Sequence, residues 1–110
     1  MARFVRGDVV VVPFPFSNLQ EAKRRPALVL SPLDGEDVIL CQITSQMSRD
    51  RDSVSLELKD FSSGSLKQAS NIRPNRLFTA DQAIVLYQAG SITAHKLDEV
   101  IDRLVQILRR

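Results

Sequence analysis

The chain has 110 residues, of which 44% are hydrophobic and 25% are charged. These values predict one globular domain over residues 1–110, long enough to bury a core. The single cysteine excludes an internal disulfide framework and favours the cytoplasm, and no apolar run approaches the roughly 20 residues that cross a bilayer. The opening residues, MARFVRGD, reach an acid before any apolar run, so we expect no signal peptide.

The net charge is only +2, so any functional basic character must be local. Three cations stand together at 23–25, and three more lie between residues 67 and 76 with no acid among them. Local basic clusters favour phosphate-rich or acidic partners, although a solvated surface is the simpler explanation for any one of them.

The first strand is expected to begin at Gly7, in GDVVVVPF, because four β-branched residues follow one another. Pro13 and Pro15 predict that regular pairing stops there, with a long loop running to Arg25. PALVLS, residues 26–31, is the expected second strand.

VILCQITS is the expected third strand, and a turn near Gly35 separates it from the second. Antiparallel pairing through this turn would bring Arg25 and Thr44 to the same end of the sheet. Alternation divides the third strand into two faces, with Val38, Leu40, Gln42 and Thr44 on one and Ile39, Cys41 and Ile43 on the other.

The middle of the chain predicts several short strands. VSLEL would place Val54, Leu56 and Leu58 on one face, and KDFSSGS would break the pairing. LKQASNIRP is expected to end as a strand at or before Pro74, with RLFTAD and AIVLYQAG each supplying a short strand. Gly90 would end the β region.

The last segment predicts a helix, because apolar residues recur there at helical spacing. Thr93 is the expected N-cap, and the lone histidine, His95, is expected on the surface of the first turn. The apolar stripe comprises Leu97, Val100, Ile101, Leu104 and Leu108. The predicted fold is therefore mainly β with a C-terminal helix packed on a strongly bent sheet or open barrel.

Several chemistries lack the residues that they need. One histidine excludes a histidine-pair nuclease within one chain, and no acid cluster has metal-ligand spacing. The four scattered glycines form no phosphate loop, and Cys41 in an apolar run is a core residue rather than a nucleophile. We expect no metal and no cofactor.

The remaining candidates are cations and neutral donors at strand ends. Arg25 precedes Pro26, which favours an extended backbone, and its planar fork suits bidentate contact with phosphate. Thr44, Ser45 and Gln46 supply neutral donors at the end of the third strand. The alternative is that Arg25 is only an edge charge and Thr44 only a strand residue.

The segments RGDVVVVPF, RRPALVLS, CQITSQ and NIRPNRLFT occur in the order and spacing of the MazF/PemK toxins of bacterial toxin–antitoxin systems, which the chain resembles over nearly its whole length. The resemblance implies an SH3-like small barrel of the MazF/PemK/CcdB type and a homodimer. It also implies metal-independent cleavage of single-stranded RNA, with inhibition of translation and growth.

The family's functional residues carry over by motif. The catalytic arginine before the R-P proline matches Arg25, the catalytic threonine matches Thr44, and the substrate-holding basic residue matches Arg73. The remaining predicted RNA-binding residues are Lys23, Arg24, Ser45 and Gln46. The basic residues are expected to converge on one groove.

Two departures from the family pattern prevent any inference about the RNA motif that is cut. Leu19–Glu21 stand where the first loop often reads Ser-Glu-Gln, and Asn71–Arg73 stand where the later motif often reads Gln-Ile-Arg.

The resemblance also implies a partner, an antitoxin whose acidic disordered tail folds onto the toxin, and DNA binding by the resulting complex. Two other functions stay open. One is a CcdB-like gyrase poison without enzymatic activity, and the other is a non-catalytic SH3-like module that binds RNA or protein.

Overall fold

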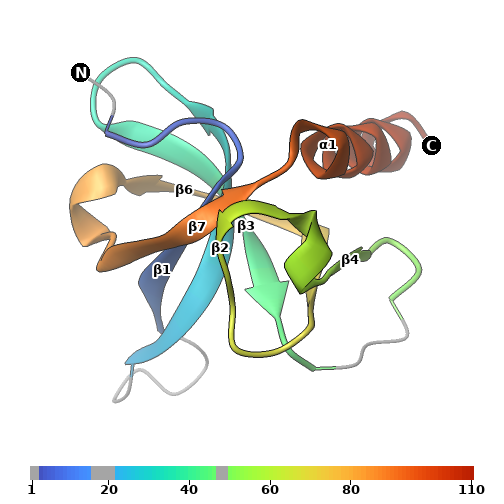
Figure 1. Cartoon of the computed structure of the whole chain (residues 1–110). Coiled ribbons are helices and arrows are strands. Elements are labelled where there is room, and N and C mark those ends of the chain that lie inside the picture. Colours follow the sequence, from blue (N-terminus) through green and yellow to red (C-terminus); the bar gives the residue numbers. More distant parts are fainter. Residues whose placement is uncertain (1–2, 16–21, 47–49) are drawn as a thin grey trace.

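The computed structural model describes residues 3–15, 22–46 and 50–110. Its strands form one antiparallel, seven-stranded sheet in the order β4-β6-β3-β2-β1-β7-β5, which curls into a half-barrel with helix α1 beside it (Figure 1). The strands are β1 (Asp8–Pro15), β2 (Ala22–Pro32), β3 (Asp37–Thr44), β4 (Val54–Leu56), β5 (Phe61–Gly64), β6 (Ser70–Asp81) and β7 (Tyr87–Ile92). The fold also contains two 3-10 helices, η1 (Leu58–Asp60) and η2 (Gln82–Ile84), and the α-helix α1 (Ala94–Arg109).

The sheet buries apolar side chains on both of its faces. Cys41 and Ile43 belong to the cluster beneath α1, whereas Val38 and Leu40 belong to a second cluster on the other face. This division confirms the predicted alternation of β3, because successive side chains of a strand point to opposite faces.

Helix α1 begins as predicted, since the Thr93 hydroxyl accepts a hydrogen bond of 3.1 Å from the backbone N–H of Lys96. Most of the predicted stripe packs against the sheet, but Leu108 is 71% exposed. It lies in the last turn, beyond the residues that contact the core. Within the described ranges, no helix is long and apolar enough to cross a membrane.

The prediction that Pro13 and Pro15 end the first strand is wrong. β1 stays paired with β2 through Pro13 and Pro15, so β2 begins at Ala22 rather than after Arg25. β7 pairs with β1 only as far as Val11. Beyond that point no strand among the described residues pairs with this side of β1, so a proline without an N–H removes no ladder hydrogen bond there.

The prediction that a strand ends at Pro74 is also wrong, because β6 continues through it and includes RLFTAD. The pairing with β3 jumps from Leu77 opposite Cys41 to Arg73 opposite Gln42. Residues 74–76 therefore bulge out of the ladder, and a bulge tolerates proline. The same bulge turns the chain immediately after Arg73.

Three smaller predictions fail near the sheet edges. Leu58 is 72% exposed in η1, where the Asp60 carboxylate accepts from the backbone N–H of Glu57 and ends the alternation. The segment expected to break pairing contains β5, and β7 continues past Gly90 to Ile92.

The substitution Gly64→Ala is expected to destabilise the fold by at least about 2 kcal/mol, because two penalties add. Gly64 has a φ of 69°, and an added Cβ would overlap the carbonyl oxygen of Ala89 on the neighbouring strand. Gly35→Ala is the matched control, since Gly35 has a φ of 80° but faces open space. Urea unfolding of both variants measures the difference, and equal losses would contradict the close approach.

Candidate functional site

A hollow of about 210 Å³ opens where β2, β3 and β6 come together. Its lining combines three arginines with neutral hydrogen-bonding side chains and includes no carboxylate among the described residues. The lining residues are Arg25, Gln42, Thr44, Gln46, Arg73 and Arg76. An electropositive concavity of this kind attracts anions.

The strand register explains why Arg25 and Thr44 meet there. The last pair of the β2–β3 ladder is Ala27 opposite Gln42. Arg25 lies two residues before Ala27 and Thr44 lies two residues after Gln42, so continuing the antiparallel register sets them opposite each other. Side chains two residues apart share a face, which brings the cation and the hydroxyl into one hollow. The predicted convergence of these two residues at one sheet end is confirmed.

The Thr44 hydroxyl has a defined environment. Its Oγ1 accepts a hydrogen bond of 3.2 Å from the backbone N–H of Gln46, and the residue is only 9% exposed. A hydroxyl donates one proton and accepts at two lone pairs, so this contact leaves its O–H to be donated elsewhere. The side chain is thereby suited to donate to an anion in the hollow.

Arg73 lies in the same hollow and is paired with an acid from outside the acid-free stretch 67–76. The carboxylate Oδ2 of Asp50 accepts from Arg73 Nη2 at 3.2 Å and from Arg73 Nε at 3.3 Å. Sequence analysis missed this acid because it lies 23 positions away along the chain.

The pKa of Asp50 is held below its ordinary value, chiefly because the backbone N–H of Asp52 donates to its carboxylate. The side-chain amide of Asn75 contributes next among the stabilising contacts, and Arg73 adds to the effect. A depressed carboxyl pKa stabilises the folded state above about pH 4, and the gain is lost as the pH falls through the folded value. Arg73 therefore keeps its ionised partner at neutral pH.

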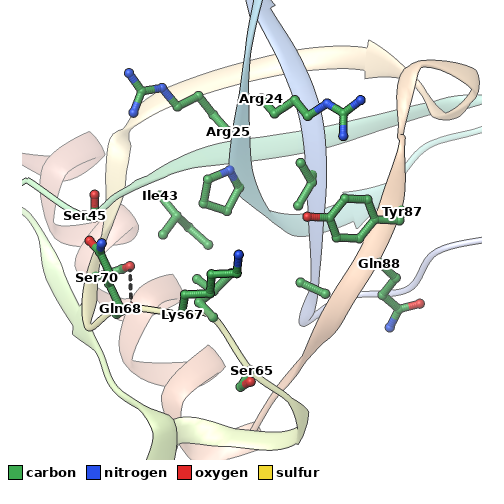
Figure 2. A pocket seen from close by; sticks show the side chains of 14 residues that line it. Arg24, Arg25, Ile43, Ser45, Ser65, Lys67, Gln68, Ser70, Tyr87 and Gln88 are labelled. Carbon is green, nitrogen blue, oxygen red and sulfur yellow. Dashed lines mark hydrogen bonds between the residues drawn. The ribbon is translucent and has the colours of Figure 1, made fainter.

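A larger hollow of about 560 Å³ adjoins the first, and Arg25 borders both. In Figure 2 the Arg25 side chain extends to the side of the view on which Ser45 lies, and the Arg24 side chain extends to the opposite side, above Tyr87. Lys67 stands across from them. The remaining lining is largely apolar or neutral and comprises Val11, Pro26, Ile43, Ser65, Leu66, Gln68, Ser70, Gln88 and Ala89.

The predicted basic residues do not converge on one groove. Arg24 and Ser45 line the larger hollow, whereas Gln46 and Arg73 line the smaller one. Lys23 is exposed on β2 and lines neither, since it lies two residues farther than Arg25 from the centre of the sheet. The predicted departure at 19–21 lies outside the described residues.

Sequence reasoning missed most of the side chains that line the hollows, including Gln42, Lys67, Arg76 and Tyr87. Gln42 had a usable signal, because it shares the Thr44 face of the third strand. Arg76 and Lys67 were visible only as cations, and Tyr87 carried no signal. Their positions depend on the β6 bulge and on pairing between distant strands.

Two other candidate groups are accounted for. Cys41 is fully buried, and loss of hydration raises the pKa of its thiol to about 12, so it stays neutral. His95 is exposed on the first turn of α1, as predicted. Among the described residues, no three His, Cys, Asp or Glu side chains are grouped to hold a metal ion.

Residues 5–108 match the family model of the PemK-like, MazF-like toxin of type II toxin-antitoxin system. The chain belongs to this family. The toxin has no match among curated proteins. Arg25, Thr44 and Arg73 all lie within the matched region.

Solved structures show that the toxin has the MazF-like fold. An endoribonuclease in complex with its cognate antitoxin, from a mycobacterial species, gives a TM-score of 0.77 at 14% identity, with 96% of this chain and 95% of that chain covered. MazF from Deinococcus radiodurans gives 0.76 at 24% identity, with 97% of each chain covered. Mycobacterium tuberculosis toxin MazF-mt6 gives 0.71 at 17% identity, with 93% and 96% covered. The predicted mainly β fold with a C-terminal helix is confirmed.

Proposed function

We propose that the toxin is an endoribonuclease that cuts single-stranded RNA without a metal, using the 2′-hydroxyl of the substrate as nucleophile. One observation carries the proposal. The register of β2 and β3 brings Arg25 and Thr44 into a hollow lined by three arginines and no described carboxylate. Family membership supports it, and two of the similar solved proteins are endoribonucleases.

The protein does not have to supply a nucleophile, because RNA carries its own in the 2′-hydroxyl group. The 2′-oxygen forms a bond to phosphorus, and the bond from phosphorus to the 5′-oxygen breaks. The 2′-hydroxyl gives its proton to solvent water and the leaving 5′-oxygen takes one from solvent water, so no net proton is consumed. The products are a 2′,3′-cyclic phosphate and a 5′-hydroxyl. The enzyme must align the two oxygens and stabilise the negative charge that develops on the phosphorane.

Arg25 and Thr44 take separate roles in this scheme. Arginine keeps its proton far above neutral pH, so Arg25 acts by stabilising charge rather than as a general base. Thr44 donates a hydrogen bond from its hydroxyl group to a non-bridging oxygen, and its Oγ1 accepts one from the backbone N–H of Gln46. Both groups act on the same phosphate because they share the smaller hollow.

The adjoining residues bind the rest of the substrate. Arg73 and Gln46 hold the phosphate at the smaller hollow, while Arg24 and Ser45 contact the flanking nucleotide in the larger one. Lys23, exposed and outside both, contributes only long-range attraction.

The direct test is incubation of the purified toxin with a mixed RNA in EDTA, followed by mapping of the new 5′ ends. Cleavage at a recurring motif is expected, with unphosphorylated 5′ ends. Complete inhibition by EDTA that added magnesium reverses would contradict metal independence.

The proposal extends to partners. The family is one of toxin–antitoxin systems, and two MazE–MazF complexes from Deinococcus radiodurans share the fold. We expect a cognate antitoxin whose acidic tail occupies the phosphate positions of the two hollows. We also expect a homodimer, which light scattering tests, and exposed Ile84 and Leu86 beside β7 support this expectation.

Binding of the antitoxin tail is expected to weaken as salt rises, because screening reduces the attraction between opposite charges. It should also weaken in the double variant Arg24→Ala/Arg73→Ala, and RNA should compete with it. The measurement is a titration of the neighbouring gene's product with and without a non-cleavable RNA. Simultaneous binding at undiminished affinity would place the tail on another surface.

A further inference from the structure

Residues 50–53, which lead into β4, are held by arginines of the C-terminal half of α1 and of the residue after it. Asp52 receives two hydrogen bonds from the Arg110 guanidinium, at 2.7 Å and 3.1 Å. Arg103 Nη1 donates to the carbonyl oxygens of Arg51 and Ser53, at 3.0 Å and 3.1 Å. These contacts fix the backbone of a segment that lacks regular secondary structure.

Asp50 begins this fixed segment and connects it to the bulge of β6. Its Oδ1 accepts from the backbone N–H of Asp52 at 2.9 Å, which fixes the carboxylate relative to the segment. Its Oδ2 accepts from Asn75 Nδ2 at 2.9 Å and from two nitrogens of Arg73. One carboxylate thus joins the segment to two side chains beside the smaller hollow.

The contact orients Arg73 while leaving part of its guanidinium available. Asp50 uses Nε and Nη2, which form one edge of the planar group. Nη1 makes no hydrogen bond to any residue that the structure describes. Because a guanidinium is rigid and carries five N–H donors, holding one edge also fixes the direction of the Nη1–Nη2 edge. That edge suits bidentate contact with phosphate, and Arg73 lines the hollow.

We propose that Asp50 is a positioning residue that orients Arg73 toward the RNA phosphate held in the smaller hollow. The inference rests on the proposed function. An unanchored arginine would lose rotamer freedom each time it bound substrate, and the contact with Asp50 removes most of that cost in advance. Asp50 itself touches no substrate.

The test is Asp50→Asn, which keeps the shape of the side chain but removes its negative charge. The group that faces Arg73 then becomes either a neutral amide oxygen or an NH2 donor. Cleavage, as kcat/KM, should fall by roughly 10- to 100-fold, because Arg73 loses its fixed direction. Binding of a non-cleavable RNA at low salt should not weaken, because the substitution removes one negative charge and makes the net charge of the protein more positive. Asp98→Asn is the charge-matched control on the exposed face of α1 and should leave both values unchanged.

A double-mutant cycle separates positioning from a general structural role. In the Arg73→Ala background, Asp50→Asn should cause no further loss of cleavage, because its effect passes through Arg73. A loss that persists in that background would overturn the inference. So would unchanged cleavage in the single variant, and faster cleavage would show that Asp50 masks Arg73 instead.

An activity-independent measurement keeps the inference separate from the proposed function. The Arg73 Nε–H resonance, assigned by its absence in Arg73→Ala, should exchange slowly with solvent in the wild type and rapidly in Asp50→Asn. Adding non-cleavable RNA should shift it in the wild type far more than in the variant. If the wild type binds RNA without cutting it, the proposed function fails and this shift still decides the role of Asp50; equal shifts in both proteins would overturn it.

Discussion

Replacing Arg25 with alanine is expected to lower the rate of RNA cleavage by about 100- to 1,000-fold, the usual loss when one charge-stabilising donor is removed from a transition state. Arg25 borders both hollows, and continuing the β2–β3 register beyond Ala27 and Gln42 sets it opposite Thr44. It is half-buried at a strand end rather than in either apolar cluster, so the fold should survive. Single-turnover cleavage and thermal unfolding measure the two effects separately.

Two further variants sharpen this test. Lys23→Ala removes a cation two positions away on the same strand but outside both hollows, and it should cost less than about threefold at moderate salt. Arg25→Lys keeps the charge but loses the planar fork, so it should restore only part of the activity. If Lys23→Ala lowered the cleavage rate as much as Arg25→Ala does, the rate would depend on net charge rather than on the position of Arg25.

The variant Thr44→Val is expected to lower cleavage by about 100-fold, because it removes the hydroxyl donor while preserving the shape of the side chain. The backbone N–H of Gln46 also loses its acceptor, which should cost about 1 kcal/mol of folding free energy. Thr44→Ser retains the hydroxyl and should keep most of the activity. The measurement is single-turnover cleavage at saturating protein, which removes any contribution from weakened binding.

If Thr44→Val cuts RNA at the wild-type rate, the Thr44 hydroxyl has no catalytic role and the residue is only part of the strand. Equal losses in Thr44→Val and Thr44→Ser would point to packing rather than to the hydroxyl.

Much of this architecture follows from local patterns in the sequence. The alternation of 38–44 identified both faces of β3, and Thr93 with the apolar stripe located α1, because side-chain periodicity and capping are properties of neighbouring residues. That Arg25 and Thr44 lie at the same end of the sheet was also predictable, since a hairpin turn near Gly35 makes the two strands antiparallel. Their exact pairing was not, because the register shifts by one residue between Val29 and Ser31.

The predictions that the structure contradicts, and the contact that the sequence did not reveal, share a different cause. Prolines at 13 and 74 predict strand ends, but the sheet tolerates both, because Pro13 lies on a side of β1 that no described strand pairs with and Pro74 lies in a bulge of β6. The Asp50 contact with Arg73 depends on the packing of segments 23 residues apart. Such features are set by tertiary pairing, which local sequence does not encode.

The central claim, that the 2′-hydroxyl of the substrate is the nucleophile, is tested most directly with two RNA oligonucleotides that share one mapped cleavage site. One is all ribose, and the other carries a single 2′-deoxy nucleotide immediately 5′ of the scissile phosphate. Both are incubated with the toxin in EDTA, and the masses of the products are measured by mass spectrometry. We predict that the first is cut to a 2′,3′-cyclic phosphate and a 5′-hydroxyl, and that the second stays intact at that site. Cleavage of the deoxy-substituted strand at a comparable rate would contradict the account.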